Sequence, residues 1–221
     1  MKVLLINSAE LKERGFIDPI CDALIETGVE TNVKEYKEIS DDFDFNIYNA
    51  VIISASPKGD NVNFEDRLRS FNWVKTTKLP VLGICAGHQF IGVLFGGELI
   101  RDRESEDGIL TVQIKEADPI FEECGGELKV EQHHNDSVTL PINFKLLADS
   151  QRCKVQAIRH KERPLYGLQW HVERSNPAIN EPPRAYARGF NLIQAALGPH
   201  LLLPVSECTF EGCLHGSQPW R

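Results

Sequence analysis

The chain lacks a hydrophobic run long enough to cross a membrane. Its first apolar run, 1–6, stops at Asn7, and charged residues follow within a few positions, so the run is too short for the core of a signal peptide. No other segment approaches the roughly 20 consecutive apolar residues of a membrane span. We therefore expect a cytoplasmic protein.

Clusters of lysine or arginine are also missing, and the net charge is −8, which argues against a nucleic-acid-binding surface. The six cysteines are scattered and lack the density of a secreted disulfide scaffold. Cys21, Cys124 and Cys153 are expected to be buried small side chains without a chemical role.

A chain of 221 residues with 42% hydrophobic and 25% charged residues has the profile of one ordinary globular domain. It contains no internal repeat, low-complexity tract or linker. We place one domain at 1–197, which ends in a helix at 184–197. Residues 198–221 are a tail of unknown role, punctuated by proline and glycine.

Short, continuous apolar runs predict the architecture. Buried parallel strands are expected at 2–7, 30–35, 50–54 and 80–84, with helices at 17–27, 64–75 and 88–95. This order predicts an α/β fold whose doubly wound, mostly parallel sheet has helices on both faces. An additional antiparallel region follows, with strands at 108–115, 128–131, 144–149, 155–160 and 165–170.

The most informative segment is Gly83-Ile84-Cys85-Ala86-Gly87-His88-Gln89, where an apolar strand turns into a helix with a cysteine at the turn. Small neighbours allow the sharp turn, and the helix N-terminus favours the thiolate form of the cysteine. This setting predicts a nucleophile. His88, by contrast, is expected to be a helix-start residue and not a second base.

A partner for this cysteine follows the last apolar strand, at His171 with Glu173 two residues on. Nucleophilic attack on an amide needs a base that later protonates the leaving amine, and a group that orients the base. Alternate residues of a strand point to one side, so we expect His171 and Glu173 on one face. The backbone N–H of Ala86 and the loop after 50–54 are candidate donors to the oxyanion.

Three motifs carry a resemblance to the class I glutamine amidotransferases, and the similarity covers about residues 1–195. Residues 83–89 fit the signature G-x-C-x-G-x-Q, and residues 169–173 resemble Q-F-H-P-E. Residues 134–138 resemble the H-G-D-x-V stretch of the GMP synthetase-like branch. The resemblance implies a flavodoxin-like amidotransferase fold.

The resemblance also implies a reaction and a set of site residues. In that family the cysteine attacks the γ-amide of glutamine, forms a glutamyl thioester and releases ammonia. The matching positions are the triad Cys85, His171 and Glu173, the oxyanion donors Ala86 and Ser56, and the glutamine pocket Gln89, His134, Asp136 and Ser137. Neither a cofactor nor a metal ion is expected.

The sequence departs from the family pattern at several points. Residues 54–57 read Ser-Ala-Ser-Pro where the family often has S-G-G-P, which is closer to γ-glutamyl peptidases of the same superfamily. Val172 replaces a proline, and Asn7-Ser8-Ala9 stands where GMP synthetases have a glycine-rich turn. An ATP-using synthetase domain is absent, so we expect the acceptor chemistry on a separate chain.

Three hypotheses follow. The first is a glutaminase that supplies ammonia to a separate ATP-dependent synthetase, and the second is a stand-alone γ-glutamyl peptide hydrolase that uses the same triad. The third is a catalytically silent regulatory module, against which the intact triad argues. Cys208, Cys213 and His215 in the tail suggest a metal site, but their spacing is not that of common zinc sites, and a flexible or docked tail is favoured.

Overall fold

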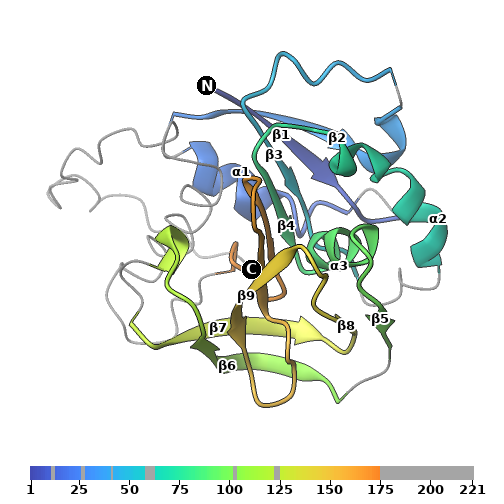
Figure 1. The fold of residues 1–221 in the computed structure, drawn as a ribbon. Coiled ribbons are helices and arrows are strands. Elements are labelled where there is room, and N and C mark those ends of the chain that lie inside the picture. Colours follow the sequence, from blue (N-terminus) through green and yellow to red (C-terminus); the bar gives the residue numbers. More distant parts are fainter. Residues whose placement is uncertain are drawn as a thin grey trace, which may run out of the picture.

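The computed structural model describes residues 1–10, 13–25, 28–40, 42–57, 63–101, 104–121 and 125–174. The predicted helix at 184–197 and the tail at 198–221, with Cys208, Cys213 and His215, lie outside the described residues, as does Cys124. The described part is built around a nine-stranded sheet in the order β2-β1-β3-β4-β11-β10-β9-β6-β7 (Figure 1).

The strands of this sheet are β1 (Lys2–Asn7), β2 (Glu30–Glu35), β3 (Ala50–Ile53), β4 (Val81–Ile84), β6 (Glu106–Ile114), β7 (Glu127–His134), β9 (Phe144–Asp149), β10 (Ala157–His160) and β11 (Leu165–Leu168). A separate two-stranded sheet pairs β5 (Leu99–Ile100) with β8 (Ser137–Val138). The helices are α1 (Asp18–Ile25), α2 (Phe64–Arg69) and α3 (Ala86–Leu94), with 3-10 turns η1 (Tyr36–Glu38), η3 (Asn72–Lys75) and η4 (Pro119–Phe121).

Helices cover both faces of the parallel half, as the sequence predicts. Strands β2, β1, β3, β4 and β11 run parallel, and their apolar residues alternate between two separate cores. Val3 of β1 packs in one core with Leu24 of α1, whereas Leu4 packs in the other with Phe90 of α3. A strand buried on both faces needs a continuous apolar run, which explains the sequence of β1, β3 and β4.

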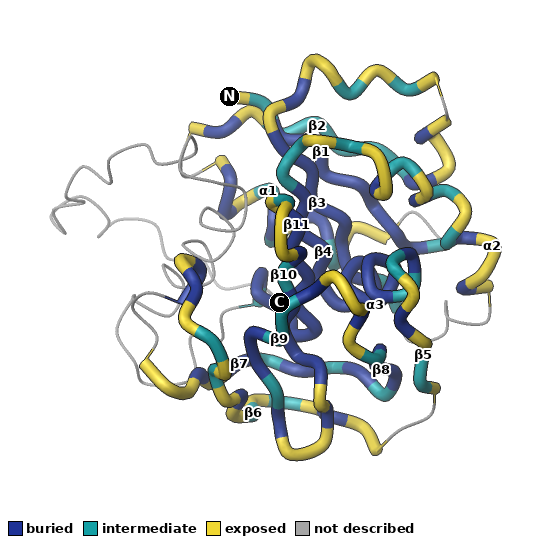
Figure 2. Tube along the Cα trace, in the orientation of Figure 1, coloured by how far each residue is buried: buried dark blue, intermediate teal, exposed yellow. Residues whose placement is uncertain are grey.

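The antiparallel half extends the same sheet. Strands β10, β9, β6 and β7 pair antiparallel to one another beyond β11. In Figure 2 the parallel strands β1, β3, β4 and β11 are buried almost throughout and the edge strand β2 is partly exposed, whereas β6 and β7 alternate between buried and more exposed residues. Alternation is the pattern of a sheet with one solvated face, and it agrees with the polar residues spaced along these strands.

Several element boundaries differ from the predicted ones. The predicted helix at 64–75 is divided into α2 and η3, and α3 begins two residues earlier than predicted, directly after Cys85. Strands β6 and β7 are longer than predicted because each is paired along nearly its whole length with the other. The β5–β8 pair was not predicted, since two residues carry too little pattern to identify a strand.

The carboxyl ends of β4 and β11 meet at one edge of the sheet. Ile84 is in register with Leu168, and the Cys85 N–H donates to the Leu168 carbonyl at 2.8 Å. Parallel register therefore brings the segment after β11 beside the segment after β4, although more than 80 residues separate them in the chain. This edge is where an open α/β sheet places its ligand site.

Candidate active site

Cys85 occupies a strained turn between β4 and α3. Its φ is +48° and its ψ is −100°, and it is the one non-glycine residue with positive φ in the described part of the chain. Such a backbone costs about 1–3 kcal/mol and persists only where the surroundings enforce it. The turn sets the cysteine at the N-terminus of α3, where the first backbone N–H groups have no acceptor within the helix.

The glycines on either side of the cysteine allow α3 to pack directly on the sheet. A Cβ at Gly83 would lie 2.5 Å from the Gly87 carbonyl oxygen, and a Cβ at Gly87 would lie 2.4 Å from the Ile53 oxygen. Real Cβ atoms do not come so close to backbone. Both positions therefore require glycine, because any larger residue would prevent α3 from packing this close to β3 and β4.

His171 faces Cys85 from the segment after β11. Its Nδ1 lies 2.8 Å from Glu173 Oε1, and the side chains of His171 and Glu173 are buried. Burial opposes a charge on His171, but the hydrogen bonds with Cys85 and Glu173 outweigh it and raise the pKa of His171 to about 10. The histidine is thus held as an imidazolium between the cysteine and the carboxylate.

The strand geometry predicted for this pair is wrong. Strand β11 ends at Leu168, and His171 and Glu173 lie in a turn after it, not in the strand that was predicted to reach Trp170. Their side chains meet through the turn, whose Arg174 N–H donates to the His171 carbonyl at 3.1 Å. The structure brings the two side chains into contact in a turn and not on a strand, and their catalytic roles stay predictions.

A pocket opens beside Cys85. Its lining comes from the loop after β3, the start of α3, the end of β7 and the two residues that join β7 to β8: Ser56, Pro57, Cys85, Ala86, Gln89, His133, His134, Asn135 and Asp136. Six of the nine residues predicted for the site therefore line one pocket, and the His171–Glu173 pair adjoins it through Cys85. Ser137, the remaining one, is buried in β8 and is absent from this lining.

The two predicted oxyanion donors, Ala86 and Ser56, line the same pocket as Cys85. Ala86 is the first residue of α3, so its N–H has no acceptor within the helix. Ser56 follows β3 in a loop that Ser8 secures: the Ser8 N–H donates to Ser54 Oγ at 3.1 Å and the Ser8 hydroxyl to the Ser54 carbonyl at 2.8 Å. Serine at position 8 thus holds the start of the loop against the end of β1.

Comparison with known proteins identifies the family. The family model of class I glutamine amidotransferases matches residues 12–181. The chain belongs to this family. The motifs at 83–89 and 169–173 both fall within the matched residues.

Relatives of this amidotransferase include subunits of GMP synthases. The glutamine-hydrolysing GMP synthase subunit of Pyrococcus abyssi is 39% identical over 125 residues, which is 56% of this chain and 65% of that protein. The matched stretch thus spans slightly under two thirds of that relative. The corresponding subunit of Methanococcoides burtonii is 31% identical over 174 residues, which is 78% of this chain and 87% of that protein.

Solved structures show the same fold. A Thermoplasma acidophilum protein described as a GMP synthase subunit has a TM-score of 0.71 at 26% identity, covering 89% of this chain and 92% of that one. A glutamine amidotransferase of Thermotoga maritima has a TM-score of 0.73 at 19% identity, covering 89% and 98%. The predicted α/β fold is therefore confirmed as that of a class I amidotransferase.

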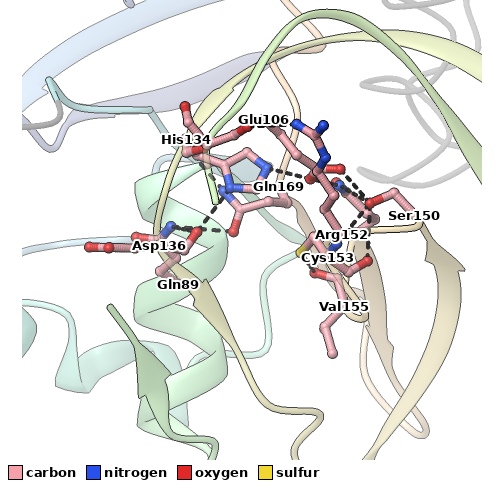
Figure 3. Close-up of polar contacts among 12 residues, drawn as sticks. Gln89, Glu106, His134, Asp136, Ser150, Arg152, Cys153, Val155 and Gln169 are labelled. Carbon is pink, nitrogen blue, oxygen red and sulfur yellow. Dashed lines mark hydrogen bonds and ion pairs between the residues drawn. The ribbon is translucent and has the colours of Figure 1, made fainter. Parts of the chain in front are cut away.

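Several residues that were predicted to form a glutamine pocket are joined by hydrogen bonds. The Gln89 amide donates to the Asp136 carbonyl at 3.1 Å and to Gln169 Oε1 at 3.3 Å. His134 Nδ1 lies 3.0 Å from the same Asp136 carbonyl. Figure 3 shows these side chains converging from α3, β7 and the segment after β11. Their roles toward a substrate stay predictions.

Residues without a predicted role also belong to the site. Gln169 donates from Nε2 to Cys85 Sγ at 3.6 Å, and the Phe16 ring stacks on His171 with centroids 5.8 Å apart. His133, which also lines the pocket, is hydrogen-bonded at 2.9 Å to Glu131. Gln169 could have been found, because it belongs to the quoted motif. Phe16 gave no signal, since only the tertiary fold brings it to His171.

His88 is the third residue of α3, near the predicted helix start, and its lack of a catalytic role stays a prediction. It is fully buried in α3, and burial lowers its pKa to about 3, so it is neutral at physiological pH. It fills the space beside Gly167, where a Cβ would lie 2.5 Å from the His88 Nδ1.

None of the helices within the described ranges is long and apolar enough to span a membrane, and the cytoplasmic location stays a prediction.

Proposed function

We propose that this chain hydrolyses the γ-amide of glutamine through a thioester on Cys85. The observation that carries the proposal is the Cys85–His171–Glu173 arrangement, with a 2.8 Å contact between the last two, at the edge of a small polar pocket. Membership of the class I amidotransferases and the names of the GMP synthase relatives support the same substrate.

The reaction has two halves, and His171 carries a proton in both. The imidazolium favours the thiolate of Cys85, which attacks the side-chain amide carbon of glutamine to form a C–S bond. The N–H groups of Ala86 and Ser56 are the proposed hydrogen-bond donors to the oxygen of the tetrahedral intermediate. In other hydrolases, removal of one such donor raises the activation free energy by about 2.7–4 kcal/mol. The C–N bond breaks as His171 gives its proton to the leaving nitrogen, and ammonia departs.

Deacylation returns the enzyme to its starting state. Neutral His171 takes a proton from water, whose oxygen attacks the thioester carbon, and glutamate leaves as the thiolate re-forms. Glu173 keeps the ring in place and stabilises its positive charge, as the carboxylate of a catalytic triad does. No other covalent chemistry is needed.

Ammonia is then used elsewhere. We propose that a separate ATP-dependent synthetase chain receives it, because the relatives are named as subunits of a synthase and the described residues form a single amidotransferase unit. The limits of that unit, 1–197 with a tail at 198–221, are part of the proposal. Docking of the synthetase over the pocket would keep ammonia from water.

One assay tests the hydrolytic step. The purified chain is incubated with glutamine, and glutamate and ammonia are measured, alone and with the synthetase that co-purifies with it. We expect turnover by the wild type and by Cys21→Ala, a control at a half-buried cysteine on α1, and none by Cys85→Ala. Mass spectrometry of the reacted protein should find the glutamyl adduct on Cys85.

Two results would contradict the proposal. Glutamine turnover by Cys85→Ala equal to that of the wild type would remove the cysteine from the mechanism. Cleavage of γ-glutamyl peptides such as glutathione, without glutamine hydrolysis in either the free or the partner-bound state, would assign the triad to a γ-glutamyl peptide hydrolase. The Ser-Ala-Ser-Pro loop at 54–57 is the feature that makes this second measurement worthwhile.

A further inference from the structure

A second group of cysteine, histidine and carboxylate lies behind the pocket. Glu106 begins β6, His134 ends β7 directly opposite it in register, and Cys153 lies in the turn between β9 and β10 (Figure 3). One oxygen, nitrogen or sulfur atom of each residue lies within 4.8 Å of those of the other two. Glu106, His134 and Cys153 are 2%, 5% and 3% exposed, so the group is sealed from water.

The imidazole of His134 is oriented as that of a metal ligand. Its Nδ1 faces the Asp136 carbonyl at 3.0 Å, so Nδ1 carries the hydrogen. Its Nε2 is buried and lies 3.2 Å from Glu106 Oε2, without the geometry of a hydrogen bond. Metal-bound histidines donate one ring N–H to a carbonyl or carboxylate and turn the other nitrogen to the ion.

The carboxylate of Glu106 is held in place from two sides. Oε1 accepts from the Ser150 hydroxyl at 2.5 Å, and Oε2 accepts from the Gln156 amide at 2.7 Å. These two donors fix the orientation of a carboxylate that is only 2% exposed and so has lost most of its hydration.

We propose that Glu106, His134 and Cys153 bind one divalent cation with zinc-like preferences. Nitrogen, oxygen and sulfur donors together are the ligand set of zinc. Tetrahedral zinc with bonds of about 2.0–2.1 Å separates a nitrogen and an oxygen ligand by roughly 3.3 Å, close to the 3.2 Å between His134 and Glu106.

The sulfur has the furthest to move. A zinc thiolate would lie roughly 3.5 Å from the other two donors, so the Cys153 side chain must approach by up to roughly 1.3 Å from its present contact with the Val155 carbonyl. The thiol gives its proton to solvent on binding. Gln156 Oε1, a buried amide oxygen without a hydrogen bond, is the candidate for the fourth ligand.

The role of the ion is structural. It would join the start of β6, the end of β7 and the β9–β10 turn, and it would fix His134 from the side that faces away from the pocket. Through the Asp136 carbonyl this restraint reaches Gln89. With Nδ1 on the Asp136 carbonyl and Nε2 on the ion, His134 would support the pocket wall and would not itself hydrogen-bond glutamine, which replaces the role predicted from the sequence. Binding of the ion is measurable without activity. The sequence alone assigned Cys153 a passive role and predicted no metal.

Cobalt titration tests the site in a Cys85→Ala background, which removes the other buried cysteine that faces a histidine. Metal-free protein is titrated with Co²⁺, and near-ultraviolet absorption reports a thiolate bound to the ion. We expect one equivalent of Co²⁺ with this band, and displacement by Zn²⁺. Adding Cys153→Ala should abolish the band, and adding Glu106→Gln should weaken binding by at least about 10-fold.

Matched variants exclude the other cysteines. Adding Cys21→Ala, Cys124→Ala, or Cys208→Ser with Cys213→Ser, should leave the band unchanged. The proposal is wrong if the parent protein shows no thiolate band, if the band survives Cys153→Ala, or if the tail variant removes it. Near-ultraviolet circular dichroism checks that each metal-free variant is folded, and if Cys153→Ala is not, undiminished Co²⁺ affinity in Glu106→Gln overturns the proposal.

Discussion

Replacement of Glu173 by glutamine tests the proposed mechanism most directly. The carboxylate of Glu173 contacts His171 Nδ1 at 2.8 Å in a buried setting, and it is one of the two partners that raise the pKa of His171 to about 10. Glutamine retains a hydrogen-bond acceptor of the same shape but removes the negative charge. The substitution Glu173→Gln therefore separates orientation of the ring from stabilisation of its charge.

The size of the effect follows from the hydrogen bond. A hydrogen bond to a charged group contributes about 1.5–3 kcal/mol, and each pKa unit corresponds to about 1.4 kcal/mol, so loss of the charge should lower the pKa of His171 by about 1–2 units. The His171 imidazolium, which protonates the leaving nitrogen, would then lose its proton at a lower pH than in the wild type. We expect the alkaline limb of kcat/KM to move down by about 1–2 pH units, with less than about a 10-fold loss at neutral pH.

The measurement is glutamate release from glutamine, followed from neutral pH to a pH above the pKa of about 10 of His171 in the wild type. Glu127→Gln, an exposed carboxylate on β7, is the matched control and should leave the profile unchanged. An alkaline limb that stays at the wild-type pH in Glu173→Gln would overturn this prediction, because Glu173 would then not support the charge of His171.

Three further predictions concern the turn and its supports. Cys85→Gly should be more stable to urea than Cys85→Ala by about 1 kcal/mol, since only glycine adopts φ +48° without strain, and equal stability would show that the turn is relaxed. Gly87→Ala should lower the free energy of unfolding by about 2–3 kcal/mol through its clash with the Ile53 oxygen, whereas Gly126→Ala, with open space around it, should cost under about 1 kcal/mol; similar values for both would contradict the packing requirement. Ser8→Ala removes the hydroxyl that binds the Ser54 carbonyl, so we expect a loss of about 1–2 kcal/mol in urea unfolding together with a lower kcat, and an unchanged kcat would show that the loop does not need this anchor.

Much of the fold was predictable because it depends on local pattern. A strand that is buried on both faces must be apolar throughout, and β1, β3 and β4 are recognised by this alone. Boundaries were harder to predict. β6 and β7 extend beyond their apolar stretches because pairing with each other satisfies their backbone groups, which no local pattern reveals.

The candidate site divides in the same way. The position of Cys85 on a tight strand-to-helix turn was predictable because the residues around it are small, as such a turn requires. The contact of His171 with Glu173 was expected, but on a strand, whereas the structure forms it in a turn after Leu168. The stacking of Phe16 on His171 could not be predicted, because the two residues meet only after α1 and β11 have been assembled on the sheet.

Local sequence was enough to identify the candidate nucleophile, the histidine and carboxylate that follow it along the chain, and the α/β class, since each depends on neighbouring residues and their periodicity. The way in which these parts meet depends on the assembled fold. The parallel register of β4 with β11 brings Cys85 to Gln169, and the antiparallel register of β6 with β7 sets Glu106 beside His134. Such contacts depend on the pairing of strands that are distant in the sequence. This pairing is stabilised by burial of apolar surface across the whole sheet, so the local sequence around either residue does not predict it.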